Sequence, residues 1–204
     1  MIQKRGQYGN PQDYFSSKLW DDYVSGFGDP QKGKKSKSMT SDVISSLFSE
    51  FWLGLDTISQ LTENGNWELR VDLVDYEENN YTAFYSHFLV EEEPPYRLKI
   101  SGFDSEISSV EDSLAHHNGM AFSTRDNDND LHDTENCAEV YLGAWWYNHC
   151  HDSNLNGMNY NAGSLPETQE FWANGIIWEN DLNIPDHDNY FSWPKATMKI
   201  RRKL

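Results

Sequence analysis

Five acidic side chains fall within residues 126–135, in the run DNDNDLHDTENC that starts at Asp126 and ends at Cys137. Carboxylates at this density repel one another unless a cation or a proton neutralises them. Carboxylate and amide oxygens are hard ligands, which suit calcium better than a transition metal. The spacing therefore predicts a calcium site. A solvated polar loop is the alternative interpretation, because Asn and Asp are also common turn residues.

The EF-hand loop is the first template for such a run, because it places oxygen ligands at positions 1, 3 and 5, Gly at position 6 and Glu at position 12. Counted from Asp126, position 6 is Leu131 and position 12 is Cys137. The template fails at both diagnostic positions, although Asp126, Asp128 and Asp130 still alternate with amides. The pattern favours a calcium loop of another geometry.

Charge and length limit the classes of partner. The 204 residues carry a formal net charge of -17 and a pI near 4.6, which argues against nucleic acid as a partner and fits a cation-binding surface. The chain is long enough for one large domain or two small ones. No apolar run approaches the roughly 18 residues of a membrane span, and the start MIQKRGQYGN lacks the apolar segment of a signal peptide. We therefore expect neither a nucleic-acid nor a membrane partner.

The elements that must position the acidic run are predicted from hydrophobic periodicity. Apolar residues between positions 14 and 24 follow a helical rhythm that ends near Gly26. Three later segments, 67–76, 81–88 and 96–101, have the apolar patterns of strands joined by short polar connectors. We therefore expect a helix followed by an antiparallel meander. Beyond the third strand regular periodicity is lost, yet several tryptophans argue against disorder there.

Two features depend on the compartment in which the protein folds. A disulfide between Cys137 and Cys150 would close a loop worth about 3 kcal/mol in the chain-entropy model, whereas two free thiols are the default in a cytosolic protein. The spacing of the cysteines leaves both states open. The tripeptide Asn80-Tyr81-Thr82 is an acceptor for N-glycosylation if the chain is secreted.

Five histidines suggest zinc-dependent hydrolysis, because imidazole coordinates zinc. They are His116, His117, His132, His149 and His151. No HExxH or similar motif is present, and the sequence His149-Cys150-His151 cannot easily direct both imidazoles to one ion. We therefore predict that the protein is not an enzyme.

Several longer motifs occur in an order and at spacings typical of one family. They are RGQYGNPQDYFSSKLWDDYVSGFG, FWLGLDTISQLT, WELRVDLVDY, HHNGMAFSTRDNDND, NCAEVYLGAWWYNHCHDSNLNG and ATMKIR. Together they cover nearly the whole chain, which resembles the C-terminal fibrinogen-like domain of fibrinogen, ficolins and tachylectins. Compared with that family, the chain begins midway through a strand, as if N-terminally truncated, and carries an insert at about 33–50.

The resemblance implies an α+β fold: a twisted antiparallel sheet with flanking helices, plus a loop-rich calcium-binding subdomain. The sheet subdomain would occupy residues 1–103, and the calcium- and ligand-binding subdomain residues 104–195. Residues 196–204 would return to the sheet, with the strand itself at about 197–202. The two parts would then form one compact unit.

The resemblance also implies how the acidic run binds calcium. Asp128 and Asp130 would supply carboxylates, and the backbone carbonyls of His132 and Thr134 would complete the site with waters. Backbone and water must contribute because calcium takes six to eight oxygen ligands. Asp126 would be a neighbour of the site.

For the cysteines, the resemblance implies a disulfide between Cys137 and Cys150, directly after the calcium loop. It also implies a cis peptide bond between His149 and Cys150. In members of the family that bind sugars, a pocket beside this bond accepts the acetyl group of N-acetylated sugars. The backbone amides of His149 and Cys150 would donate to the acetyl oxygen there.

Side chains of that pocket are carried over from the resemblance one by one. Tyr141 would form an aromatic wall, His151 follows the second cysteine, and Trp172-Ala173 stands where a Tyr-Ala pair is usual. Core packing is the alternative role for Tyr141, Trp172 and His151. Segment 179–193 departs from the family pattern, which leaves the position of a further aromatic wall open.

Two functions follow from the resemblance, both in a secreted, extracellular protein. The first is calcium-dependent recognition of acetylated glycans on microbial surfaces, as in lectins of innate immunity, with oligomers possible in the full-length protein. The second is a non-lectin interaction module that engages a protein partner or a peptide end. Calcium is the expected cofactor.

Overall fold

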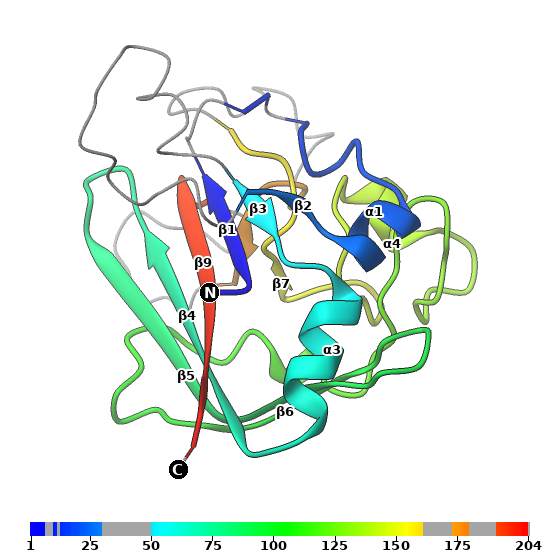
Figure 1. The fold of residues 1–204 in the computed structure, drawn as a ribbon. Helices are drawn as coiled ribbons and strands as arrows, with labels where there is room; N and C mark the ends of the chain where they lie inside the picture. The colour runs from blue at the N-terminus through cyan, green and yellow to red at the C-terminus, as the bar shows by residue number, and fades with distance from the viewer. Residues whose placement is uncertain (7–9, 12, 30–49, 161–172, 180–190, 204) are drawn as a thin grey trace, which may run out of the picture.

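A seven-stranded antiparallel sheet organises the computed structural model, which describes residues 1–6, 10–11, 13–29, 50–160, 173–179 and 191–203 (Figure 1). The strand order is β2-β3-β1-β9-β4-β5-β6. The strands are β1 (Gln3–Gly6), β2 (Phe27–Gly28), β3 (Phe51–Trp52), β4 (Trp67–Val74), β5 (Asn80–Val90), β6 (Leu98–Phe103) and β9 (Lys195–Arg202). The predicted antiparallel sheet of an α+β fold is thereby confirmed.

The alternation along β4 explains why this segment forms a strand with one buried face. Leu69, Val71 and Leu73 are each at most 1% exposed, whereas Arg70 between them is exposed. β5 and β6 follow as neighbours in the sheet, because short connectors allow successive strands to pair antiparallel. The predicted meander is confirmed, and its strand ends differ from the predicted ones by at most two residues.

The return strand lies in the middle of the sheet, between β1 and β4. Met198 of β9 pairs with Gln3 on one side and with Val71 on the other. The last strand of the chain thus joins the N-terminal strand to the meander. β1, β9 and β4 therefore each have a partner on both sides, which leaves none of them as an exposed sheet edge.

The predicted helix between positions 14 and 24 is wrong in its first half. Residues 13–17 form a turn, and helix α1 (Trp20–Ser25) begins only after it. The backbone N–H of Trp20 donates to the Asp126 carboxylate at 3.0 Å, which satisfies an N–H group at the helix start. A partner 106 residues away along the chain therefore helps to set the start of α1, and local periodicity does not contain that information.

A second helix, α3 (Leu55–Glu63), packs beside β5. Its buried residues follow the spacing of one helical face and are Leu55, Ile58, Ser59 and Thr62. Thr62 also accepts a hydrogen bond through Oγ1 from the backbone N–H of Val90 in β5. α3 therefore anchors the end of β5, and α1 and α3 flank the sheet (Figure 1).

Beyond β6 the described part of the chain is rich in loops, as predicted. Its short elements are the 3-10 turn η1 (Ala115–His117), α4 (Cys137–Val140), β7 (Ser153–Asn154) and β8 (Ile177–Trp178). Four buried tryptophans hold these loops in place, Trp145, Trp146, Trp178 and Trp193. Trp146 contacts Trp52 of β3 at 6.2 Å between ring centroids, so one core spans the sheet and the loops. The division into subdomains at residue 103 stays a prediction.

None of the helices in the described ranges is long and apolar enough to cross a membrane.

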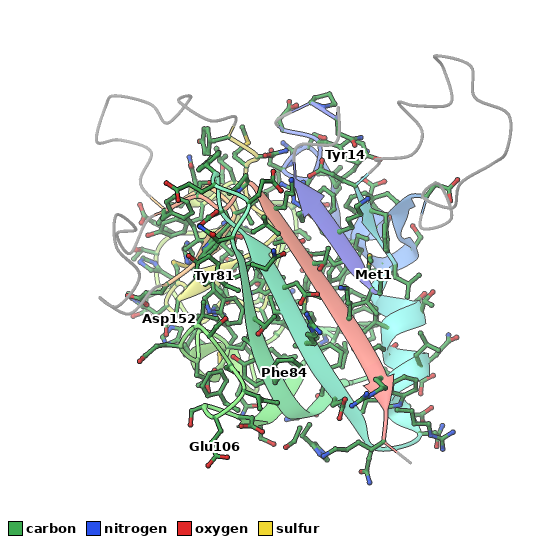
Figure 2. The ribbon with its side chains drawn as sticks, turned by 90° about the vertical axis from the view of Figure 1, so that its left-hand side faces the viewer. Met1, Tyr14, Tyr81, Phe84, Glu106 and Asp152 are labelled. Carbon is green, nitrogen blue, oxygen red and sulfur yellow. A yellow bond between two sulfur atoms is a disulfide. The ribbon has the colours of Figure 1, made fainter. Side chains whose placement is uncertain are left out.

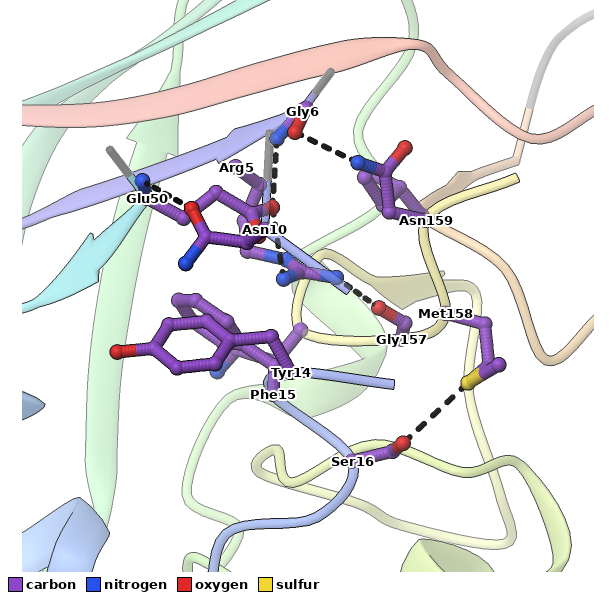
Figure 3. A network of polar contacts seen from close by, with 12 residues as sticks. Arg5, Gly6, Asn10, Tyr14, Phe15, Ser16, Glu50, Gly157, Met158 and Asn159 are labelled. Atoms are coloured by element: carbon purple, nitrogen blue, oxygen red, sulfur yellow. Dashed lines mark hydrogen bonds and ion pairs between the residues drawn. The ribbon is translucent and has the colours of Figure 1, made fainter. Parts of the chain in front are cut away.

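The predicted insert at 33–50 lies almost entirely outside the described residues. Its last residue, Glu50, is described, and its side chain is fully buried in an ion pair with Arg5 of β1 (Figure 3). Glu50 therefore belongs to the packed domain, and the bounds of the insert stay a prediction.

Candidate calcium and ligand site

Asp128 and Asp130 lie in the loop 126–135, called the acidic loop below, which leads to α4. The backbone N–H of Asp130 donates to the Asp128 carboxylate at 3.1 Å. The two carboxylate oxygens of Asp130 accept from the backbone N–H groups of His132 and Cys137, each at 2.8 Å. The structure therefore brings the two predicted carboxylate ligands together in a tight loop beside the first cysteine.

The environment of Asp130 opposes its negative charge. Partial burial raises the pKa of the Asp130 carboxyl and the neighbouring Asp128 carboxylate raises it further, whereas the hydrogen bonds from His132 and Cys137 lower it. A bound cation would reverse this balance, because a nearby opposite charge favours the ionised carboxylate. These are the electrostatics of a loop that a divalent cation would stabilise.

His132 and Thr134, the predicted carbonyl ligands, continue the acidic loop. The Nδ1 atom of His132 accepts from the backbone N–H groups of Thr134 at 3.4 Å and Glu135 at 3.1 Å. The His132 ring also stacks on the His149 ring, with 4.3 Å between centroids. The acidic loop is therefore in direct contact with the residue that precedes Cys150.

Asp126 has a different role in this loop. Its carboxylate accepts from the backbone N–H of Trp20 at 3.0 Å and from the Thr124 hydroxyl at 2.7 Å, so it connects the acidic loop to α1. Within the described residues, no three His, Cys, Asp or Glu side chains gather closely enough to hold a metal ion. A calcium ion would therefore need backbone carbonyls and waters besides Asp128 and Asp130, and the calcium site stays a prediction.

The predicted disulfide is present, with Cys137 bonded to Cys150 and 5.7 Å between their Cα atoms. The peptide bond between His149 and Cys150 is cis, as the resemblance implied. Asn136, for which the sequence predicted no role, caps α4 by accepting from the backbone N–H of Ala138 at 2.8 Å. An Asn directly before a helical turn is the sequence signal for such a cap, and it holds Cys137 at the start of α4.

Tyr141 and His151, which follow the two cysteines, form an edge-to-face contact with 4.5 Å between ring centroids. Both ring nitrogens of His151 are buried, and neither makes a hydrogen bond of normal geometry to a described residue. Burial lowers the pKa of the His151 imidazole to about 4, against a smaller opposing effect of the Ala173 backbone. His151 is therefore neutral at physiological pH, and among the described residues its ring nitrogens lack the hydrogen bonds of normal geometry that buried groups usually make.

The backbone at the cis bond offers hydrogen-bond donors. Neither the His149 N–H nor the Cys150 N–H donates to any described residue. Ala173 is buried and has a positive φ of 66°, while Trp172 lies outside the described residues. The structure thus brings His149, Cys150, His151 and Tyr141 to one place, with the Ala173 backbone beside His151.

His117, which had suggested a zinc ligand, is a core residue. Its Nδ1–H donates to the Trp146 carbonyl at 2.8 Å, and its Nε2 accepts from the Ser153 N–H at 3.1 Å. Burial lowers the pKa of this imidazole to about 3. His117 therefore joins η1 to the loop after Cys150 as a neutral side chain with both nitrogens bonded.

Acid should destabilise the fold through His117. The imidazole binds a proton near pH 6.5 in the unfolded state but only near pH 3 in the folded state. The stability gained by burying a neutral His117 is therefore present above pH 6.5 and is lost as the pH falls below it. At about pH 5 the expected loss from His117 is about 2 kcal/mol, and His151, whose pKa burial also lowers, adds to the total. Urea unfolding at about pH 7.5 and about pH 5, in the presence of a calcium chelator, measures this loss.

Two variants provide the control for this pH effect. His117→Asn should reduce the acid-dependent loss by about 2 kcal/mol, whereas His87→Gln, at an exposed histidine of β5, should leave it in place. Equal losses in the two variants would contradict the assignment to His117.

An antiparallel sheet joined to a loop-rich half by one core is the architecture of fibrinogen-like globe domains. The fibrinogen-like globe domain of human ANGPTL6 matches with a TM-score of 0.78 and 31% identity, over 100% of this chain and 77% of that chain. A lamprey fibrin D-dimer, complexed with the peptide ligand Gly-His-Arg-Pro-amide, matches with a TM-score of 0.75 and 30% identity. That match covers 98% of this chain and 59% of the lamprey chain.

The family model described as the C-terminal globular domain of the fibrinogen beta and gamma chains matches residues 1–203. The chain therefore belongs to the family of fibrinogen C-terminal domains. Techylectin-5A from Tachypleus tridentatus is 38% identical over 202 residues, which are 98% of this chain. The chain spans 58% of the length of Techylectin-5A.

Proposed function

We propose that this domain is a lectin-type recognition domain that binds acetylated glycans in a calcium-dependent manner. The observation that carries the proposal is the cluster beside the disulfide, where the Tyr141–His151 ring contact adjoins two backbone N–H groups without described partners. An acetyl group suits this cluster, because its methyl packs on aromatic rings and its oxygen accepts from N–H groups. The similarity to Techylectin-5A, a lectin by its name, supports the same function.

Each group in the cluster has a role in this proposal. The backbone N–H groups of His149 and Cys150 donate to the acetyl oxygen. Tyr141 and His151 contact the methyl group, and Ala173, whose backbone lies beside His151, adjoins it. Trp172 stays a predicted ligand-binding residue outside the described residues. The neutral state of His151, caused by its burial, keeps a charge away from the methyl group.

Asp128 and Asp130 would hold calcium together with the backbone carbonyls of His132 and Thr134. The bound ion supplies the positive charge that offsets the repulsion between the two carboxylates. The stack of His132 on His149 connects the acidic loop to the cis bond. Ordering of this loop therefore fixes the backbone donors of the pocket, which is why we expect ligand binding to depend on calcium.

The disulfide supports an extracellular site of action, because disulfides form and persist in oxidising compartments. A secreted protein that captures acetylated glycans on microbial surfaces would act in innate immunity. One sugar site binds weakly, so oligomers of a full-length protein would gain avidity on a surface that displays many copies of the ligand.

Replacing Tyr141 by Ala should weaken capture on N-acetylglucosamine-coated beads by at least about tenfold, because a loss of about 1.4 kcal/mol of ring contact weakens binding by that factor. Calcium affinity should stay unchanged, since the predicted ligands belong to the acidic loop. The wild-type protein should bind the beads in calcium and elute with free N-acetylglucosamine or with a chelator.

The matched variant Tyr141→Phe keeps the ring and should retain capture. Failure of free N-acetylglucosamine to release the wild-type protein would refute the lectin function. Release by the sugar but not by the chelator would contradict the calcium dependence and leave the lectin function in place.

Recognition of a peptide end is a second candidate function. It is favoured by the lamprey fibrin D-dimer, which is 30% identical to this chain and is described in complex with Gly-His-Arg-Pro-amide. Calorimetric titration with that peptide and with N-acetylglucosamine separates the two functions. Binding heat with the peptide and none with the sugar would favour the peptide function.

A further inference from the structure

Asn80 and Thr82 lie on the outer face of the sheet, at the start of β5. Side chains alternate along a strand, and Ala83 is fully buried, so Asn80 and Thr82 share the opposite face. Asn80 pairs with Val74 and Thr82 with Asp72 of β4. Figure 2 shows this face toward the viewer, with no described helix in front of it. Asn80 is exposed to solvent there.

The turn before Asn80 is held by hydrogen bonds that do not involve the Asn80 amide. The Oδ1 atom of Asp75 accepts from the backbone N–H groups of Glu77 at 2.9 Å and Asn79 at 2.8 Å. Among the described residues, Asn80 Nδ2 has one long hydrogen bond, of 3.3 Å, to the Glu78 carbonyl. A substituent on this nitrogen would therefore project into solvent without disturbing the turn.

We propose that Asn80 carries an N-linked glycan. Asn80-Tyr81-Thr82 fits the Asn-x-Ser/Thr acceptor pattern and is the only such tripeptide in the 204 residues. This proposal rests on the extracellular compartment of the proposed function, because N-linked glycans are attached during entry into the secretory pathway. The structure adds that the acceptor amide is exposed on an ordered hairpin, where a bulky glycan can be accommodated.

The chemistry requires a lipid-linked oligosaccharide as the donor. Asn80 Nδ2 forms a bond to C1 of the first sugar of a polyprenyl-diphosphate-linked oligosaccharide. The bond between C1 and the diphosphate oxygen breaks, and the polyprenyl diphosphate leaves with the bonding electrons. The nitrogen loses one proton, so the product is a neutral N-glycosidic amide.

The glycan would lie away from the candidate ligand site. Figure 1 shows the hairpin of β4 and β5 at the upper left, whereas α4, which starts at Cys137, lies at the right. The glycan would therefore leave Tyr141 and the acidic loop accessible. It would cover the end of an outer sheet face that no described helix covers, which limits association through that face.

The test uses the full chain behind a cleavable secretory leader, expressed in eukaryotic cells. Treatment of the secreted protein with a peptide-N-glycosidase should lower its mass and convert Asn80 to Asp in the peptide that contains it. Asn80→Gln and Thr82→Val should each abolish both signals. Thr82→Ser preserves the acceptor pattern and should retain them.

The proposal would be overturned if the wild-type protein were secreted with its disulfide formed but with Asn80 unmodified. It would also be overturned if the wild-type protein stayed inside the cell and never acquired the glycan. An equal mass loss in the Asn80→Gln variant would also overturn it. Capture on N-acetylglucosamine beads is measured in parallel for Asn80→Gln and should match that of the wild type. Failure of capture in both proteins would count against the lectin function and leave the glycan result intact.

Discussion

Replacing Glu50 by Gln will lower the free energy of unfolding by about 3–5 kcal/mol, because it leaves the charge of Arg5 buried and uncompensated. Both side chains are fully buried, with 2.9 Å between Arg5 Nη1 and Glu50 Oε1. The same carboxylate oxygen accepts from the Gly6 N–H at 2.8 Å. A neutral amide at position 50 would therefore weaken two contacts inside a region that excludes water.

Arg5 also connects the N-terminal strand to the loop-rich half of the chain (Figure 3). Its guanidinium donates to the Gly157 carbonyl and lies 3.8 Å from the centroid of the Phe15 ring. Burial lowers the pKa of Arg5 and raises that of Glu50, while the attraction between the two groups opposes each shift. Each charge is therefore tolerated in the core because the other is present.

Urea unfolding at neutral pH measures the effect of Glu50→Gln. The double variant Arg5→Met/Glu50→Leu should recover most of the lost stability, because a packed apolar pair can replace a buried ion pair. As a matched control, Glu78→Gln removes the more exposed ion pair with Lys195 and should cost no more than about 1 kcal/mol. A loss at Glu50 as small as that of the control would disprove the importance of the buried pair.

The second large effect is expected at Asp128. Calcium at about 100 times its dissociation constant should raise the free energy of unfolding of the wild-type protein by about 2.7 kcal/mol, if it binds the folded state alone. Replacing Asp128 by Ala should abolish most of this gain, because one of the two carboxylate ligands is lost. Without calcium the variant should lose little stability, since the repulsion that raises the Asp130 pKa is also removed.

Thermal unfolding in millimolar calcium and in chelator measures this gain. Asp128→Asn keeps an acceptor for the Asp130 N–H but removes the charge, so it separates ion binding from the hydrogen bonding of the loop. Asp133→Asn changes an exposed acid of the same loop and should leave the calcium gain intact. An identical melting temperature of the wild-type protein in calcium and in chelator would contradict the calcium site.

The strands of the meander could be predicted from sequence because their signal is local. In β4, Leu69, Val71 and Leu73 face the core and Arg70 faces solvent, so the alternation is present in the sequence itself. The start of α1 could not be predicted in this way. A hydrophobic rhythm runs from position 14 to position 24, but residues 13–17 form a turn, and a distant carboxylate bonds to the first N–H of the helix.

For the candidate site, too, the features that are local in sequence could be predicted and the contacts between distant residues could not. Asp128 and Asp130 are two residues apart, so a single loop had to contain both, and the family resemblance paired Cys137 with Cys150 correctly. Spacing alone left the state of the cysteines open, because a separation along the chain does not determine the distance between two Cα atoms. The role of His117 was missed, since nothing near it in sequence indicates that both of its nitrogens are bonded in the core.

The sequence by itself therefore determined the sheet, the acidic loop and the family. The tertiary structure alone decided which distant groups meet: Arg5 with Glu50, and His132 with His149. Hydrophobic periodicity and turn chemistry depend on neighbours a few residues apart, so a sequence contains them directly. Contacts between distant segments depend on how the whole chain packs around one core, and no local pattern contains that arrangement.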